Sequence, residues 1–269
     1  MTTDDHRLAR ELAELAGERL LAVRADLHAQ GAEGRELKDA GDAASQEVLA
    51  AALRERVPGD AVLSEEAGDD HARLSAERVW IVDPLDGTRE FSEVPRDDWA
   101  VHVALWQSGE LVAGAVALPA RGVTYGTAAQ DRVQLPARPA GDTPLRLAVS
   151  RSRPPAFAEE LGRTMGATTV PMGSAGVKAM SVLDGSSDAY VHAGGQYEWD
   201  SAAPVAVARA AGLHTSRVDG SPLVYNRPDP TLPDLVVARP EVAERVLAAI
   251  ARVEARTTDQ TAPTPETAR

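Results

Sequence analysis

The 269-residue sequence contains no cysteine. Disulfide bonds and cysteine-based zinc or iron–sulfur sites are therefore excluded, and any bound metal ion must be held by oxygen atoms or histidine. The sequence also has no run of about eighteen apolar residues, so it predicts no membrane-spanning helix. Residues 1–6 lack the basic and apolar regions of a secretory signal, which favours a cytoplasmic protein.

Positive charge is scarce as well. The chain has 28 basic and 41 acidic side chains, with a formal net charge of −13. A protein that binds long DNA or RNA needs a basic face, and no segment concentrates lysine and arginine enough to form one. Extended nucleic acids are thereby excluded as partners, whereas a small nucleotide is not. Lysine occurs only at Lys38 and Lys178, which singles out both positions.

The first half of the chain predicts two helices followed by strands. Leucines and a valine recur every three to four residues over 7–27, which is typical of a helix with one buried face. A second helix is expected to begin near Asp42 and to end at Val57, because a proline and a glycine follow. Short apolar runs predict strands at residues 61–64, 79–82, 100–106 and 111–118, the last two being antiparallel neighbours.

The second half alternates more regularly and favours a layered α/β architecture. Strands are predicted at 145–149, 168–170, 189–192 and 235–238, and helices at 155–165, 176–183, 201–211 and 241–253. A segment rich in proline, alanine and glycine at 130–143 is expected to join two lobes of one catalytic unit, at about 7–140 and 144–254. Residues 257–269 are expected to form a flexible tail.

The strongest local signal is the motif Asp83-Pro84-Leu85-Asp86-Gly87-Thr88, which follows a predicted buried strand. The proline fixes the backbone, so that the carboxylates of Asp83 and Asp86 can converge. The Leu85 carbonyl is then available as an oxygen ligand, Gly87 permits a tight turn, and Thr88 can cap the following helix beside an anion. The motif is typical of a Mg²⁺ site next to a phosphate, although aspartates with proline or glycine also occur in simple turns.

Other acidic residues favour the metal site over a simple turn. Glu65 follows a predicted strand, and Asp200 and Asp42 lie near predicted helix starts. Each has an ordinary explanation, because a glutamate pair is often a solvated turn and an aspartate often caps a helix. Their combination with the motif at 83–88 is much more specific than any one of them.

Four segments together resemble the inositol monophosphatase superfamily: Glu65-Glu66, residues 80–88, residues 173–176 and residues 199–203. The resemblance extends from about residue 8 to residue 253. It implies an α-β-α-β-α sandwich of two lobes, of the type also found in fructose-1,6-bisphosphatase. It further implies a homodimer with Mg²⁺-dependent, lithium-sensitive hydrolysis of phosphomonoesters.

The resemblance also implies roles for individual residues. Two or three Mg²⁺ ions would be held by Glu65, Asp83, the Leu85 carbonyl, Asp86 and Asp200. Thr88, paired with Asp42, would orient a metal-activated water that attacks phosphorus directly, without a phosphoenzyme. Asp39 is an alternative to Asp42, because the surrounding sequence departs from the pattern usual in the family.

Within this superfamily, the segments 89–91, 198–204 and 220–226 resemble the CysQ-type 3′(2′),5′-bisphosphate nucleotidases. This branch implies hydrolysis of 3′-phosphoadenosine 5′-phosphate (PAP) to AMP and phosphate in sulfate assimilation. The sulfated form of PAP is a further candidate substrate. An inositol-phosphate or sugar-phosphate phosphatase is an alternative. A non-catalytic sensor of Mg²⁺ or nucleotide is an alternative of another class.

A bisphosphate substrate needs a second anchor away from the metal ions. The turn at 173–176, with Ser174 and Ala175, and the following Lys178 offer backbone N–H groups, a hydroxyl and a cation. Further candidate substrate contacts are Gly87, Thr88, Ser150, Arg151 and Tyr197, the last by stacking on adenine. Lys178 could also be a solvated helix lysine, and Tyr197 a rim or core residue. The six histidines show no metal-ligand spacing, and no role is assigned to them.

Overall fold

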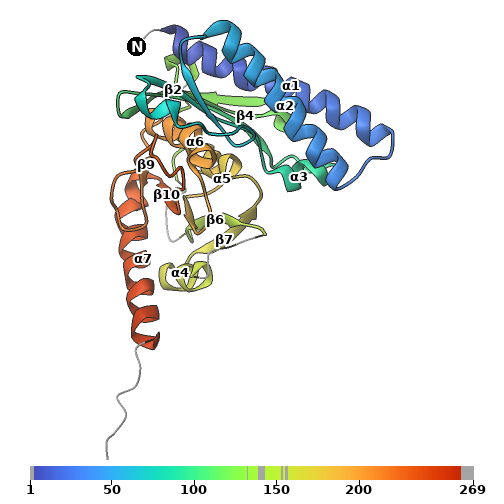
Figure 1. Ribbon diagram of the computed structural model, residues 1–269. Helices are drawn as coiled ribbons and strands as arrows, with labels where there is room; N and C mark the ends of the chain where they lie inside the picture. Colours follow the sequence, from blue (N-terminus) through green and yellow to red (C-terminus); the bar gives the residue numbers. More distant parts are fainter. Residues whose placement is uncertain (1–2, 132, 139–142, 153, 155–156, 262–269) are drawn as a thin grey trace, which may run out of the picture.

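The structure is a computed structural model that describes residues 3–131, 133–138, 143–152, 154 and 157–261. Two five-stranded sheets alternate with three layers of helices in these residues (Figure 1). The order of the layers is helices, sheet, helices, sheet, helices. The predicted α-β-α-β-α sandwich is therefore confirmed.

The first sheet has the order β1-β2-β3-β4-β5. Its strands are β1 (Ala61–Ser64), β2 (Arg78–Asp86), β3 (Ala100–Gln107), β4 (Glu110–Leu118) and β5 (Val123–Gly126). β1 is parallel to β2, and the other pairs are antiparallel. Helices α1 (Thr3–Ala29) and α2 (Arg35–Arg56) cover one face, where leucines of both helices pack against Trp80 and Val103 in a buried apolar cluster.

The second sheet has the order β7-β6-β8-β10-β9. Its strands are β6 (Arg146–Ser150), β7 (Thr168–Met172), β8 (Ala189–Ala193), β9 (His214–Ser216) and β10 (Asp234–Ala238). Helices α4 (Ala158–Met165) and α7 (Pro240–Thr261) lie on its outer face. The remaining short helices are α3 (Thr88–Ser92) and the 3-10 turns η1 (Ala72–Ser75), η2 (Pro119–Arg121) and η3 (Ala129–Asp131).

Helices α5 (Ala175–Leu183) and α6 (Glu198–Ala210) form the layer between the two sheets (Figure 1). They are buried on nearly all sides, because each faces a sheet on both of its flanks. Gly114 of β4 permits the close approach of α6, since a Cβ atom there would lie 2.9 Å from the Ala206 Cβ. The first turns of both helices lie beside the end of β2.

The second helix begins at Arg35, so the expectation of a start near Asp42 was wrong. Gly41 lowers the helical propensity of this segment, yet it lies within α2 for a packing reason. A Cβ atom on Gly41 would lie 2.6 Å from the Phe91 Cε1 and 2.9 Å from the Leu85 Cδ2. The glycine thus brings α2 close to the segment that follows β2.

Other boundaries also differ from the expectation. β2 continues to Asp86 instead of ending at Val82, α6 begins at Glu198, and α7 runs to Thr261. The unpredicted strands β5 and β9 are short and, unlike β1, contain no run of apolar residues. Residues 132, 139–142, 155–156 and 262–269 lie outside the described residues, and with them parts of the expected inter-lobe segment, helix and tail. The division into two lobes stays a prediction.

No described helix has both the length and the apolar character needed to cross a membrane.

Candidate metal and phosphate site

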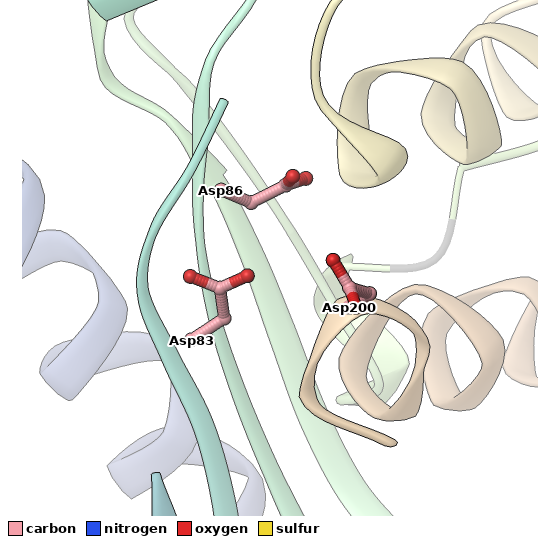
Figure 2. A group of neighbouring side chains, drawn as sticks. All are labelled: Asp83, Asp86 and Asp200. Atoms are coloured by element: carbon pink, nitrogen blue, oxygen red, sulfur yellow. The ribbon is translucent and has the colours of Figure 1, made fainter. Parts of the chain in front are cut away.

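Three carboxylates meet between β2 and the start of α6. Asp83 and Asp86 come from β2 and Asp200 comes from α6, and each offers an oxygen within 4.8 Å of the others (Figure 2). Asp83 is 1% exposed and Asp86 is 8% exposed. Buried carboxylates this close repel one another, and carboxylate oxygens are the ligands preferred by hard divalent cations. The donor set therefore fits a metal ion.

A bulge in β2 brings Asp83 and Asp86 to the same place. Residues three apart on a regular strand face opposite sides of the sheet. Asp83 pairs with His102 and Asp86 pairs with Ala100, so β2 has one residue more than β3 between these two pairs. The Pro84 carbonyl within the bulge accepts a hydrogen bond of 2.6 Å from the Ser45 hydroxyl of α2. The motif thus folds as a bulge held by the neighbouring helix.

Repulsion within the cluster is visible in the pKa values. Burial and the charges of Glu65 and Asp86 raise the pKa of Asp83 well above its usual value. Burial and the charge of Asp86 raise the pKa of Asp200 to about 6. Metal ligands must be deprotonated, so cation binding would release the protons that these groups retain.

Glu65 follows β1, and its carboxyl group interacts with that of Asp83, although the residue as a whole is exposed. Burial of the carboxyl group and the charge of Asp200 raise the pKa of Glu65 to about 7. The Leu85 carbonyl accepts a hydrogen bond of 3.1 Å from the Thr88 hydroxyl. Both predicted ligands thus lie next to the cluster of three aspartates.

One oxygen of Asp86 is held by the turn before α5. Its Oδ2 accepts hydrogen bonds from the Ser174 hydroxyl at 2.5 Å and from the Gly176 N–H at 2.7 Å. Burial alone would raise the pKa of Asp86, but the neighbouring His102 ring and Lys178 ammonium hold it below its usual value. Asp86 is therefore the carboxylate of the cluster that remains ionised most readily.

Asp42 and Thr88 are brought together, as the resemblance implied. The Thr88 hydroxyl lies 3.4 Å from the Asp42 Oδ1. Burial and the charge of Glu66 raise the pKa of Asp42 to about 7. The alternative residue, Asp39, is exposed and pairs with Arg35 at 3.3 Å.

Asp42 lies inside α2, whose N-cap is Gly34, so the alternative that it is a simple helix cap does not hold. The expectation that Thr88 caps the next helix was wrong. Gly87, with a φ of 87°, is the N-cap of α3, and Thr88 is the first helical residue. Only a residue without a side chain adopts this left-handed conformation without strain, so the cap falls one residue earlier than predicted.

A cavity of about 570 Å³ opens beside the cluster. Its lining includes Glu65 and most of the predicted site residues: Asp86, Gly87, Thr88, Ser150, Ser174, Ala175, Lys178 and Asp200. Arg89, Glu90 and Gly173, which belong to the segments that resemble the family, and Ser152, next to the candidate anchor Ser150-Arg151, also line it. Sequence reasoning assigned no role to three further lining residues, His192, Gly195 and Gln196, because no motif marks the end of β8.

Lys178 is buried, so it is not a solvated helix lysine. Its Nζ donates hydrogen bonds to the carbonyl groups of Gly173 at 2.5 Å and Ser174 at 2.7 Å. Burial lowers its pKa to about 8, while the charge of Asp86 opposes that shift. A lysine ammonium has three N–H donors, and these two carbonyl groups account for two of them. Lys178 thus fixes the turn before α5 and also lines the cavity.

Arg151 and Tyr197 are not among the residues that line this cavity. The Arg151 guanidinium pairs with Glu90 at 2.6 Å and with Glu93 at 2.9 Å. The Tyr197 ring is stacked on Trp199, with centroids 4.7 Å apart and planes 8° apart. Both side chains therefore already have partners within the protein.

His102 is the most notable residue that sequence reasoning passed over. It is completely buried beside the cluster, opposite Asp83 in the pairing of β2 with β3. Spacing along the chain does not reveal its role, because it reaches the site across the sheet through the register of β3 against β2.

Known proteins resemble this chain both in sequence and in fold. A model of the inositol monophosphatase family matches residues 2–255. A 3′-phosphoadenosine 5′-phosphate phosphatase of Mycobacterium bovis is 55% identical over 243 residues, which cover 88% of this chain and 89% of that protein. The 3′(2′),5′-bisphosphate nucleotidase CysQ of Escherichia coli is 35% identical over 69% of this chain and 78% of its own. The crystal structure of CysQ from Bacteroides thetaiotaomicron superposes with a TM-score of 0.74 at 27% identity, covering 88% of this chain and 97% of that one.

Proposed function

The chain belongs to the inositol monophosphatase family, and on this premise we propose that it is a Mg²⁺-dependent phosphatase that converts PAP to AMP and inorganic phosphate. In this reaction a water oxygen forms a bond to phosphorus while the bond from phosphorus to the ribose 3′ oxygen breaks. The observation that carries the proposal is the group of Asp83, Asp86 and Asp200 at the edge of a cavity of about 570 Å³. Relatives that match most of the chain are named for this substrate or for the 3′(2′),5′-bisphosphate nucleotidase activity.

The metal ligands in this proposal are carboxylates with the Leu85 carbonyl. Asp83, Asp86, Asp200 and Glu65 would hold two or three Mg²⁺ ions. Bound Mg²⁺ lowers the pKa of water and offsets the negative charge of the phosphate. The chain itself supplies few positive charges near the cluster, so cations would also reduce the repulsion between the substrate and the carboxylates.

Asp42 and Thr88 would orient the attacking water. The hydroxyl of Thr88 lies between the Asp42 carboxylate and the Leu85 carbonyl, at 3.4 Å and 3.1 Å. A group that accepts a proton works best when its pKa is near the operating pH. Asp42, with a pKa raised to about 7 by burial and by Glu66, is suited to accept a proton through Thr88.

The second phosphate would lie near Ser174, Ala175, Lys178 and Ser150, which line the same cavity. Backbone N–H groups at the start of α5 and the one remaining donor of Lys178 support this placement. Arg151 would have to exchange Glu90 for phosphate in order to take part. Tyr197 would extend its stack with Trp199 to the adenine ring. The proposal also includes a homodimer, which sedimentation would test.

The proposal is tested by phosphate release from PAP, its sulfated form, inositol 1-phosphate and fructose 1,6-bisphosphate, with and without Mg²⁺. PAP should be the preferred substrate, and turnover should require Mg²⁺. Equal or better turnover of inositol phosphate would assign the protein to the inositol phosphatases. No Mg²⁺-dependent turnover of any ester would favour a non-catalytic sensor.

Asp86→Asn is the matched inactive variant for this assay. The substitution keeps the size of the side chain and removes its charge, so the variant should fold. Its turnover should fall at least about 100-fold, because loss of a group that only orients a metal ligand already costs about 10–100-fold. Circular dichroism would verify the fold. Substantial residual activity would remove Asp86 from the proposed ligand set.

A further inference from the structure

His102 lies in β3 directly beside the acidic cluster, and the roles assigned above do not use it. Its side chain is completely buried. The ring lies between three elements. Its Nδ1 faces α6, its Nε2 faces the bulged end of β2, and one edge of the ring faces α5. The surroundings of these two nitrogens indicate what the residue does.

The Nδ1 atom faces α6. It lies 3.1 Å from the Trp199 carbonyl oxygen, in the first turn of that helix, and 4.0 Å from the Asp83 Oδ2. A carbonyl oxygen only accepts hydrogen bonds, so Nδ1 is the donor. This bond fixes the rotation of the ring relative to the residue that precedes Asp200.

The Nε2 atom faces Asp86. It lies 3.2 Å from the Asp86 Oδ2, the same oxygen that accepts hydrogen bonds from Ser174 and Gly176. Because Nδ1 already donates to a carbonyl group, Nε2 attracts this carboxylate oxygen only when both ring nitrogens carry a proton. The contact is off the line of an ideal hydrogen bond, and no other described side chain or backbone group is a partner for Nε2. Three groups from two elements thus converge on Oδ2, which leaves Oδ1 as the oxygen that can take a metal ion.

The fold reserves space for the His102 ring at this point. Gly176 lies in the first turn of α5, and a Cβ atom there would lie 2.2 Å from Nε2. The same Cβ would lie 3.1 Å from the Val116 Cγ1, so the neighbourhood has no room to shift. Gly176 therefore both donates to Asp86 and admits the ring that contacts it.

We propose that His102 is a positioning residue, which holds Oδ2 of Asp86 so that Oδ1 points to the metal ion. This inference rests on the proposed function, because it presupposes a metal ion at the acidic cluster. Groups that orient a metal ligand without touching the metal are typically worth 10–100-fold in metal affinity or activity. His102 should therefore act on metal affinity first and on binding of the nucleotide least.

Three substitutions at position 102 separate the two contacts. In His102→Gln the amide nitrogen reaches the place of Nε2, so the contact with Asp86 is kept. In His102→Asn it reaches only the place of Nδ1, so the contact with Trp199 is kept and that with Asp86 is lost. His102→Leu fills the space and keeps neither contact. His214→Gln, in β9 at the edge of the second sheet, is the matched control.

The measurement is calorimetric titration of each metal-free protein with Mg²⁺ and Mn²⁺, together with kcat, KM for PAP and the Mg²⁺ concentration for half-maximal turnover. His102→Leu and His102→Asn should weaken metal binding about 10–100-fold with little change in KM. His102→Gln should bind metal nearly as well as the wild type, because it keeps the contact with Asp86. Equal metal binding by the wild type and His102→Leu, or His102→Gln binding as weakly as His102→Leu, would overturn the inference.

Melting temperatures in EDTA separate this role from a structural one, since a structural role would lower the melting temperature without changing the affinity of the folded protein. If His102→Leu does not fold, Gly176→Ala serves instead, because the new Cβ atom displaces the His102 ring from Asp86. Unchanged metal affinity of Gly176→Ala would also overturn the inference. A wild type that binds metal without hydrolysing PAP would refute the proposed function alone. A wild type that hydrolyses PAP and is indifferent to position 102 would refute the role of His102 alone.

Discussion

The Ser174 hydroxyl donates to the Asp86 Oδ2 at 2.5 Å and accepts from the Val177 N–H at 3.0 Å. A single side chain thus caps α5 and holds a carboxylate of the cluster. Ser174→Ala should reduce the free energy of unfolding by about 1 kcal/mol, the usual contribution of an N-cap. It should also weaken Mg²⁺ binding about 10-fold. Urea unfolding and calorimetry would measure the two effects, and a variant with lower stability but unchanged affinity would separate the cap from the metal site.

The raised carboxyl pKa values predict that the metal-free protein loses stability as the pH rises from about 4 to 7. The pKa values of Asp42 and Glu65 are raised to about 7 and that of Asp200 to about 6, whereas these groups titrate near 3.8 and 4.5 when unperturbed. The folded state therefore holds more protons than the unfolded state in this window, and its stability falls with rising pH. Melting temperatures in EDTA across this range would show the decline.

Mg²⁺ should reverse this loss at pH 7.5, because a ligand that binds only the folded state stabilises it. Asp200→Asn removes a buried carboxylate that Asp86 repels, so this variant should melt a few degrees higher than the wild type in EDTA at this pH. A gain of about 1 kcal/mol in the free energy of unfolding shifts the melting temperature about 2–4 °C in a domain of similar size. Asp26→Asn, at an exposed position of α1, is the control that should leave the pH dependence unchanged. A flat pH profile in EDTA would contradict the proposed origin of the shifts.

Gly41→Ala should destabilise the protein although alanine is the better helix former. The new Cβ atom would lie 2.6 Å from Phe91 and 2.9 Å from Leu85. Overpacking of this kind costs about 1–3 kcal/mol, against about 1 kcal/mol gained in helix propensity. Because Leu85 carries a predicted ligand carbonyl, turnover should fall as well. Gly59→Ala, with open space around the new methyl group, is the matched control, and equal stability of both variants would contradict the close contact.

Lys178→Ala should reduce turnover of 3′,5′-bisphosphates more than that of nucleoside monophosphates, if Lys178 anchors the second phosphate. Its bonds to the Gly173 and Ser174 carbonyls predict a loss of stability in addition. Lys178→Met keeps most of the volume and removes the charge, so it separates packing from binding. An equal loss of activity on both substrate classes would limit Lys178 to its structural bonds.

The layers of the fold were predictable because their signals are local. Helix α1 has one buried face, which produces a readable period, and the strands β3 and β4 are buried over most of their length, which produces apolar runs. The acidic cluster was predictable from the motif at 83–88 and its resemblance to a known family. The start of α2 was not, since the role of Gly41 depends on Phe91, a residue of another element.

Contacts across the sheet were beyond local reasoning. The position of His102 opposite Asp83 depends on the register of β3 and on a bulge, and neither is written in the spacing of residues along the chain. Lys178 was singled out because lysine is rare, but its bonds to two carbonyl groups required the turn before α5 to be seen in three dimensions. Asp42 lies beside Thr88 and Asp39 pairs with Arg35, a difference that the sequence did not show.

The acidic cluster draws its members from two adjacent layers, since Asp83 and Asp86 belong to the first sheet and Asp200 to the central helices (Figure 2). A cation bound by all three would cross-link these layers at a point where mutual repulsion otherwise pushes them apart. Amide hydrogen exchange should then slow together in β2 and in the first turn of α6 when Mg²⁺ is added. The ion would thus act as part of the fold as well as part of the chemistry.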